Sequence, residues 1–345
     1  MRKKVTCPAC GAVMNDPDKC ESCGFVPAEL ACFADQAALA LWKTVYVPPK
    51  PSAEKLIILS QSKLATLNPK THVLTLYNQF ERLMTLQNVR QFSMSASHWV
   101  ALMMDGHVEA GDDNTYQQCA VSDLNNVSFV HAAGTCTYLI VDGLVVVRGY
   151  SMFEKALSMW SDIVQIAAGE KVVVGLKANG EVLIAASDSA PEDMRTRLVR
   201  RTPDVNIHTY RAPDSWQQVI AVEAGSEYIL ALTADGEVLS LGMVGGAKLS
   251  LAWKEPIVSI AASRTHAIGL TGGGTLLFAG KPRSRSRFSS NLETTAQGWA
   301  QLAAVGAAGS IAAGVTESGD LLLAGRPAYA SLPDEPHWDK NALKG

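Results

Sequence analysis

The sequence predicts an all-β fold in which small antiparallel sheets form a closed array, and three observations favour it. Related segments recur along most of the chain, and within each segment apolar residues alternate with polar or small ones. Two-residue turns such as Asn-Gly and Asp-Gly join the alternating runs, as is typical of β-hairpins. The 3.6-residue periodicity of a helical solenoid is missing from these segments.

The repeat register defines the elements in order. Four segments align from residues 163, 219, 257 and 302, two more copies lie upstream, and a degenerate copy begins at residue 56. A tryptophan precedes each of the four aligned segments: Trp160, Trp216, Trp253 and Trp299. The apolar residue that follows the hairpin turn recurs seven times: Val73, Val108, Val145, Val182, Val238, Leu276 and Leu321. The spacings are 35, 37, 37, 56, 38 and 45 residues, which indicates a period near 37 with two insertions. Such small sheets need neighbours on both faces, and closing the ring removes exposed edges.

The repeated segments resemble a known family. The run IVQIAAGEKVVVGLKANGEVLIAA from residue 163 and its relatives are similar to the regulator of chromosome condensation repeat, in the short-period version found in many bacterial proteins. The resemblance covers roughly residues 54–345 and implies a seven-bladed β-propeller there. The first copy departs from the pattern because it lacks both the glycine and the Asp-Gly turn, and the second has a shortened hairpin. Guanine-nucleotide exchange is not carried over from the family name.

Four cysteines near the N-terminus form two closely spaced pairs. Cys7 and Cys10, then Cys20 and Cys23, are each separated by two residues and followed directly by glycine. This spacing lets both thiolates of a turn face one ion, and four sulfurs suit a tetrahedral zinc site. Residues 1–27 are therefore predicted to be a small zinc ribbon that holds one structural Zn²⁺. Disulfides or free thiols, and a single iron in place of zinc, are the alternatives.

A helix and a linker are predicted to join the ribbon to the repeats, over residues 28–53. The Ala-rich segment 28–43 has helical composition, whereas three prolines within residues 47–52 prevent a helix from continuing. The ring is then assigned to residues 54–345. The remaining cysteines have no spaced partners and are interpreted as buried small apolar residues: Cys32, Cys119 and Cys136.

Composition limits the classes of function. The chain is 48% apolar and 18% charged, with 30 Lys+Arg against 33 Asp+Glu, so it is not a globally basic nucleic-acid binder. The basic start lacks the apolar stretch of a signal peptide, and the uncharged segment 301–316 is too short for a membrane span. The expected compartment is the cytoplasm, without membrane association.

No set of residues predicts an enzyme. His98 and His266 occupy the same place in two aligned copies, which favours a structural role fixed by the repeat. The carboxylates of Asp105, Asp142 and Asp235 lie in predicted hairpin turns, where aspartate bonds the nearby backbone. Nucleophile-elbow, Walker-type and dinucleotide-binding motifs are missing from the sequence. No catalytic residue, cofactor-binding residue or small-molecule substrate is therefore predicted.

The two insertions are the candidate binding elements, because loops on a rigid scaffold commonly carry recognition. Both leave their repeats at the same stage, so their bases are expected to share one rim of the ring. The insertion at 187–215 contains five basic and five acidic residues, and its basic residues cluster at Arg195, Arg197, Arg200 and Arg201. The basic residues of the insertion at 281–298 are Lys281, Arg283, Arg285 and Arg287. The leading hypothesis is a non-catalytic scaffold that binds a protein partner. The alternatives are nucleic-acid association through the ribbon and the arginines, and solvated loops without a partner. A third alternative is an enzyme with its site in the central channel, for which the sequence identifies no set of residues.

Overall fold

The computed structural model describes residues 5–6, 13–14, 56–60, 63–68, 71–78, 81–187, 189–195, 197–202, 206–244, 246–280, 296, 298–309, 311–316 and 321–325. Several sequence predictions lie outside these residues: the four zinc-ribbon cysteines, the helix at 28–43, the proline-rich linker and the basic residues from Lys281 to Arg287. Near the N-terminus, β1 (Val5–Thr6) pairs with β2 (Val13–Met14) in a two-stranded antiparallel sheet.

Residues 56–325, where the structure describes them, form seven antiparallel sheets of three to five strands. The first sheet contains β3 (Leu56–Leu59), β4 (Lys63–Asn68), β5 (Val73–Asn78) and β6 (Glu81–Leu86). The second contains β7 (Val89–Met94), β8 (His98–Met103) and β9 (Val108–Asp112). The third contains β10 (Val127–Ala133), β11 (Cys136–Val141) and β12 (Leu144–Gly149).

The fourth sheet is the widest and contains β13 (Ile163–Ala168), β14 (Val172–Lys177), β15 (Val182–Ser187), β17 (Ile207–Arg211) and β16 (Arg197–Arg201), in that spatial order. The fifth contains β18 (Val219–Ala224), β19 (Tyr228–Thr233), β20 (Val238–Val244) and β21 (Ala247–Lys248). The sixth contains β22 (Ile257–Ala262), β23 (Ala267–Thr271) and β24 (Leu276–Ala279). The seventh contains β25 (Leu302–Ala308), β26 (Ile311–Thr316) and β27 (Leu321–Gly325).

The repeat register read from the sequence matches these strands. Each of the seven marker residues lies at the start of the third strand of its sheet; Val145 is the second residue of β12, and the other six are first residues. The predicted all-β character is confirmed. In the described part of the chain, the helical residues are α3 (Glu154–Leu157), the 3-10 turn η1 (Glu192–Met194) and the single residue Ala296. None of the described helices is long and apolar enough to cross a membrane.

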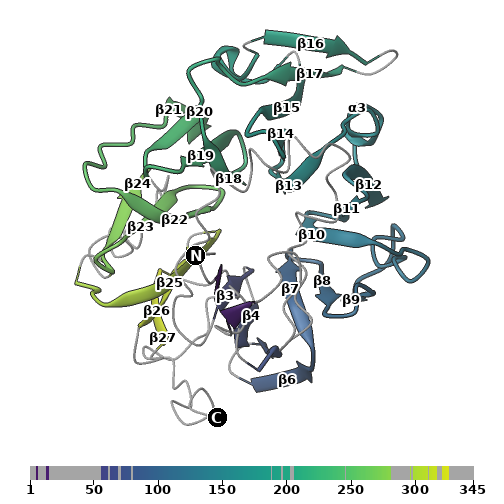
Figure 1. The fold of residues 1–345 in the computed structure, drawn as a ribbon, viewed down its shortest axis with the longest axis vertical. Coiled ribbons are helices and arrows are strands. Elements are labelled where there is room, and N and C mark those ends of the chain that lie inside the picture. The colour runs from purple at the N-terminus through teal and green to yellow at the C-terminus, as the bar shows by residue number, and fades with distance from the viewer. Residues whose placement is uncertain are drawn as a thin grey trace.

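The sheets follow one another around a common centre (Figure 1), and the first packs against the last. Leu64 and Tyr77 of the first sheet form one buried cluster with Ala304, Ala313 and Val315 of the seventh. The ring therefore closes by packing between the two sheets. The tail beyond the seventh repeat resembles the opening of another repeat, so residues 336–345 are also predicted to pair with strands from the start of the ring, and they lie outside the described residues.

Consecutive sheets are also joined by a recurring backbone hydrogen bond. The first residue of a first strand donates its N–H to a turn carbonyl of the preceding sheet. Four such bonds, with N···O distances of 2.9–3.0 Å, run from the N–H of Val89 to the carbonyl of His72, from Ile163 to Gly143, from Ile257 to Gly236 and from Leu302 to Gly274. In five sheets the residue before the first strand has a positive φ between 53° and 60°: Asn88, Asn126, Asp162, Gln218 and Gln301. Asparagine and aspartate adopt this left-handed conformation more readily than most other residues, whereas glutamine is an unusual choice.

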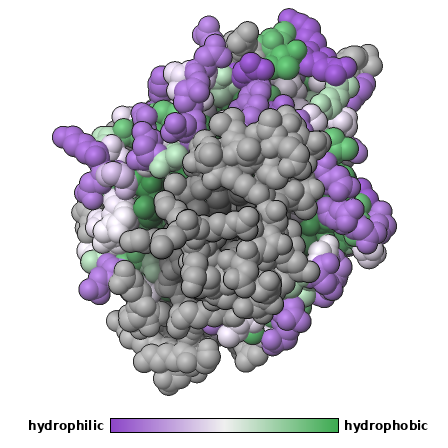
Figure 2. Space-filling model, in the orientation of Figure 1, coloured by the Kyte–Doolittle hydropathy of each residue, from purple (hydrophilic) through white to green (hydrophobic). Residues whose placement is uncertain are grey.

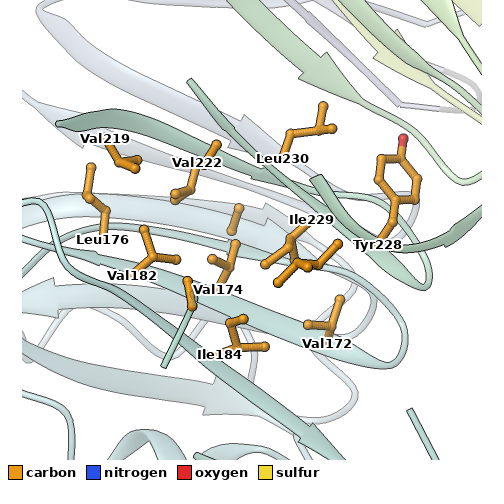
Figure 3. Packing of buried hydrophobic residues seen from close by; sticks show 14 of the residues in the cluster. Val172, Val174, Leu176, Val182, Ile184, Val219, Val222, Tyr228, Ile229 and Leu230 are labelled. Carbon is orange, nitrogen blue, oxygen red and sulfur yellow. The ribbon is translucent and has the colours of Figure 1, made fainter. Parts of the chain in front are cut away.

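The core lies between neighbouring sheets, and Figure 3 shows the contact of the fourth with the fifth. Val172, Val174 and Ile184 from β14 and β15 face Val222 and Ile229 from β18 and β19, and all five are fully buried. These residues alternate along their strands, which accounts for the period-two pattern in the sequence.

The tryptophans that precede the repeats cover glycines of the second strands. Trp160 lies over Gly175 and Trp253 lies over Gly269, so that an added Cβ would come within 2.6 Å and 2.8 Å of the indole rings. The Trp160 indole N–H also donates to the Thr209 hydroxyl at 3.0 Å. Glycine is needed at these strand positions because any larger residue would displace the ring.

Candidate functional site

The insertion at 187–215 was expected as a loop, and that expectation was wrong for nearly half of its length. It contains η1 and the two strands β16 and β17, which extend the fourth sheet outward. β17 pairs with β15 from Ser187↔Ile207 to Leu183↔Arg211, and β16 pairs with the other side of β17. Of the predicted binding residues, the structure places Arg195 directly after η1, and Arg197, Arg200 and Arg201 on β16.

The base of the insertion is anchored on the next sheet. The Asp193 carboxylate accepts a hydrogen bond from the Gly242 N–H, at 3.1 Å to each oxygen. Met194 is completely buried in the core between the fourth and fifth sheets. These contacts hold η1 against β20, so the hairpin leaves the ring from a fixed base.

β16 is the outer strand of the sheet, and its described side chains are exposed to solvent. Leu198 and Val199 are 43% and 52% exposed, and Arg200 and Arg201 are also exposed. Figure 2 shows hydrophilic side chains around a hydrophobic group at the end of the molecule where β16 lies in Figure 1. Among the described residues, no ion pair engages Arg195, Arg200 or Arg201, whereas Arg211 of β17 pairs with Glu181 at 2.6 Å.

The second insertion leaves from the matching place in the sixth sheet. β24 ends at Ala279 as β15 ends at Ser187, and both are third strands two sheets apart. The ends of these two strands are therefore consistent with the expectation that both insertions start on the same rim of the ring. Lys281, Arg283, Arg285 and Arg287 themselves lie outside the described residues, so their relation to β16 stays a prediction.

The two aligned histidines are structural, as their register predicts. Both are 1% exposed, and burial lowers the pKa of each to about 4. His98 Nδ1 contacts the Ser95 hydroxyl at 3.1 Å, and His266 Nδ1 contacts the Ser263 hydroxyl at 2.9 Å. The sequence signal is Ser-x-x-His, which occurs in these two copies; the first copy has Ser60 with Lys63 at the histidine position, and the other four aligned turns carry glycine or alanine at the serine position.

The hydroxyls of the serines in these pairs also form hydrogen bonds with the backbone of their own turns. Ser263 Oγ accepts the His266 N–H at 3.2 Å and donates to the His266 carbonyl at 3.0 Å. His98 Nε2 bonds Thr137 of the third sheet at 2.7 Å, so it links two sheets. In the seventh sheet, Ala312 occupies the position that corresponds to Thr137 in the third. Alanine has no hydroxyl to offer, and His266 Nε2 has no hydrogen-bond partner. Because no carboxylate orients either imidazole in the described structure, these pairs do not have the arrangement of a nucleophile and its base.

The centre of the ring contains a cavity of about 710 Å³ lined by the first strands of all seven sheets and by the turns that follow them. Glu223 and His131 are two of the ionisable residues on its wall. Burial raises the pKa of Glu223 to about 8 and lowers that of His131 to about 4. His131 Nε2 accepts the Ala168 N–H at 3.1 Å, which links the third and fourth sheets. At neutral pH both side chains are therefore mainly uncharged.

Polar groups at the mouth of this cavity pair with one another. Glu170 accepts a hydrogen bond from Ser226 at 2.8 Å and forms an ion pair with Arg264 at 3.2 Å. In the described residues no group of three or more His, Cys, Asp or Glu side chains is arranged to hold a metal ion. Sequence reasoning could place an enzyme site in a central channel but named none of its residues, because the lining comes from seven separate parts of the chain.

Comparison with known proteins bears on the fold. No family model matches the sequence, and no curated protein is similar to it. Among solved structures, the CRINKLY WD40 ectodomain of the Arabidopsis thaliana receptor kinase ACR4 is similar with a TM-score of 0.59 and 15% identity, over 82% of this chain and 98% of that chain. The ectodomain of the Physcomitrella patens receptor kinase CR4 has a TM-score of 0.56 and 14% identity, over 81% and 74%.

Yeast RCC1 (Prp20), solved bound to Kap60, is similar with a TM-score of 0.49 and 15% identity, over 68% of this chain and 69% of that chain. At these identities the other two likenesses show a fold and carry neither a family nor an activity. WD40 domains are rings of small antiparallel sheets around a central channel, which is the arrangement described above. The ring of this chain is therefore a β-propeller.

Proposed function

We propose that this chain is a non-catalytic, cytoplasmic protein-interaction scaffold. In this proposal a seven-bladed propeller of the regulator of chromosome condensation repeat type presents loops to a protein partner, and a structural zinc ribbon over residues 1–27 supplies an accessory contact. The seven sheets of the described ring support the blade count. The observation that carries the proposal is the anchored β16–β17 hairpin, which holds exposed arginines and apolar side chains on a rigid sheet.

The arginines provide the test. Replacing Arg200 and Arg201 with glutamate, or Arg283, Arg285 and Arg287 with glutamate, is expected to reduce capture of the partner from native lysate about tenfold or more, because charge-assisted contacts are lost. The melting temperature should stay unchanged, since exposed charges contribute little to stability. Affinity capture with quantitative mass spectrometry measures the first effect, and thermal unfolding measures the second.

The matched control is Lys248→Glu with Lys254→Glu, which reverses two exposed charges on the neighbouring fifth sheet and the segment after it. This control should retain capture. If both arginine variants capture every protein that the parent captures, the insertions are solvated segments without a partner and the proposal is wrong.

A second candidate function is nucleic-acid association, because residues 195–202 contain four arginines and no carboxylate. It predicts duplex DNA binding that weakens steeply with salt and is lost in the same arginine variants. The proposed scaffold predicts weak binding to random duplex DNA at physiological salt. A fluorescence titration at two salt concentrations separates the two functions.

The zinc ribbon is tested by metal analysis. One zinc per chain is expected on Cys7, Cys10, Cys20 and Cys23, and replacing any one of them with serine should release it. Because so small a segment has little apolar core, metal loss should unfold residues 1–27 and leave the ring folded. Elemental analysis and limited proteolysis measure the two effects. Chain purified without chelator that contains no metal would contradict the prediction.

A further inference from the structure

We propose that the outer edge of β16 binds an extended acidic segment of a protein partner by strand addition, so that the segment becomes a sixth strand of the fourth sheet. This inference rests on the proposed scaffold function and specifies the chemistry of the partner and its mode of binding. It begins from the position of β16. In the described structure β16 pairs only with β17, so the backbone N–H and C=O groups of its other side have no strand partner.

The side chains of β16 select the charge of the partner. The eight residues from Arg195 to Thr202 contain four arginines and no acidic residue, although the whole chain has a net charge of −3. Adjacent strand residues point to opposite faces, so Arg200 and Arg201 offer a cation on each face of the sheet. The neighbouring cation, Arg211, is already paired with Glu181. Carboxylates on an added strand would complement the arginines of β16 as cross-strand pairs.

The same features exclude a second copy of this chain as the occupant. Pairing β16 with itself would bring arginines opposite arginines, and like charges directly opposite one another destabilise a sheet. The register of β16 against β17 also shifts between Leu198 and Arg200, where Val199 is the extra residue. Charges of one sign and a bulge are the devices that protect edges from self-association, whereas an acidic strand is attracted by the same charges.

Leu198 and Val199 favour a protein strand over a nucleic acid. They are 43% and 52% exposed and lie between Arg197 and Arg200. A phosphate backbone would meet the arginines and leave this apolar surface in water. A peptide strand can place apolar side chains opposite Leu198 and Val199 and use the backbone groups of the open edge, which is the usual form of β-augmentation.

The edge is positioned to accept a strand without rearrangement. β17 pairs with β15, and η1 is held by Asp193 and the buried Met194 on the fifth sheet. An added strand would therefore meet an edge that is already in place, and less ordering free energy is lost than with a mobile loop.

The test uses the full chain and a synthetic peptide with the sequence Thr-Glu-Glu-Val-Val-Glu-Thr, blocked at both ends. Its glutamates and valines are complementary to β16 in the antiparallel direction. A second peptide, Thr-Glu-Glu-Pro-Pro-Glu-Thr, has the same charge but lacks two N–H donors and cannot form the ladder. We expect the valine peptide to bind at least about tenfold more tightly than the proline peptide and to slow amide hydrogen exchange in residues 197–201.

Three variants complete the design. Arg200→Glu with Arg201→Glu should weaken binding of the valine peptide about tenfold or more. The control Lys248→Glu with Lys254→Glu makes the same change in net charge and should alter binding less than about twofold. Leu198→Thr with Val199→Thr retains the arginines and should also weaken binding, by a smaller factor.

Each other result overturns the inference. Equal binding of the two peptides, or binding without slower exchange in β16, shows charge attraction without strand addition. Tighter binding of a DNA oligonucleotide than of the valine peptide at physiological salt assigns the edge to nucleic acid, and self-association of the parent chain in sedimentation assigns it to a second copy.

The result of the peptide test can be distinguished from the result of the lysate-capture test of the proposed function. Loss of lysate capture in the arginine variant without protection of β16 by the peptide leaves the scaffold standing and rejects strand addition. Peptide binding with protection of β16, but with no change of capture in the variant, supports strand addition and rejects the scaffold function of these arginines.

Discussion

Lowering the pH from 7 to 4 is expected to reduce the free energy of unfolding by about 3 kcal/mol for each of three histidines with lowered pKa values. The three residues are His98, His131 and His266, and burial lowers the pKa of each from 6.5 to about 4. In the unfolded chain they recover the ordinary value. Between these two pKa values the unfolded state binds more protons than the folded state. The stability that they contribute is therefore complete above pH 6.5 and is lost as the pH falls toward 4.

Glu223 acts in the opposite direction. Burial raises its pKa from 4.5 to about 8, so the folded state holds this proton at pH 7 while the unfolded state has released it. Lowering the pH removes this unfavourable contribution of Glu223, and the stability gained offsets the stability lost from roughly one histidine. The net expectation is still a loss on the order of 6 kcal/mol between pH 7 and 4.

Urea unfolding at a series of pH values measures this effect. His266→Phe should reduce the net pH-dependent loss by about half, from about 6 to about 3 kcal/mol, because one of the three histidines is removed and a ring of similar size packs beside Phe278. His107→Gln is the control, since His107 is exposed and lies in a hairpin turn. A parent chain equally stable at pH 7 and 4, or equal pH dependence in both variants, would contradict the assignment.

Replacing Gly169 with alanine is expected to destabilise the ring by about 3 kcal/mol. The Cβ of that alanine would lie 1.7 Å from the carbonyl oxygen of Gly225 in the turn of the neighbouring sheet. The obstacle is backbone, which cannot rotate away as a side chain can. The two turns are also joined by the Lys171 N–H, which donates to the Ser226 carbonyl at 3.0 Å. Relief of the clash would therefore pull the fourth and fifth sheets apart.

Gly298→Ala is the matched control for this substitution. An added Cβ at Gly298 meets nothing within 4 Å, so its effect should stay within about 0.5 kcal/mol. Chemical denaturation of both variants measures the difference. Equal stability of the Gly169 variant and the parent would show that the turns of the fourth and fifth sheets are not packed as described.

Much of the ring could be predicted because its information is local and repeated. The alternation of apolar residues fixes which face of each strand is buried, and the turn residues fix where strands end. Asp105, Asp142 and Asp235 were predicted to lie in hairpin turns, and each lies between the second and third strands of its sheet. The structural interpretation of His98 and His266 also needed only the register, because a residue tied to the repeat has the same surroundings in each copy.

The prediction failed where the chain departs from the repeat. The insertion at 187–215 has mixed charge and turn residues at its ends, so its hairpin was hidden from periodicity. β16 and β17 form there because β15 offers an open edge. Cys119 was expected to be buried, yet it is partly exposed and its thiol lies 3.3 Å from the Asp113 carbonyl.

By itself the sequence determined the class of fold, the number of repeats, the strand register and the separate cysteine-rich segment, because each of these depends on residues close together in the chain. The tertiary structure alone decided which turns touch, such as those of Gly169 and Gly225, and which side chains share the central channel. It also decided that Thr137 satisfies His98 while Ala312 leaves His266 Nε2 unpaired. These pairs lie 39 to 56 residues apart, and contacts of that separation depend on how whole sheets pack around the ring, which no local pattern records.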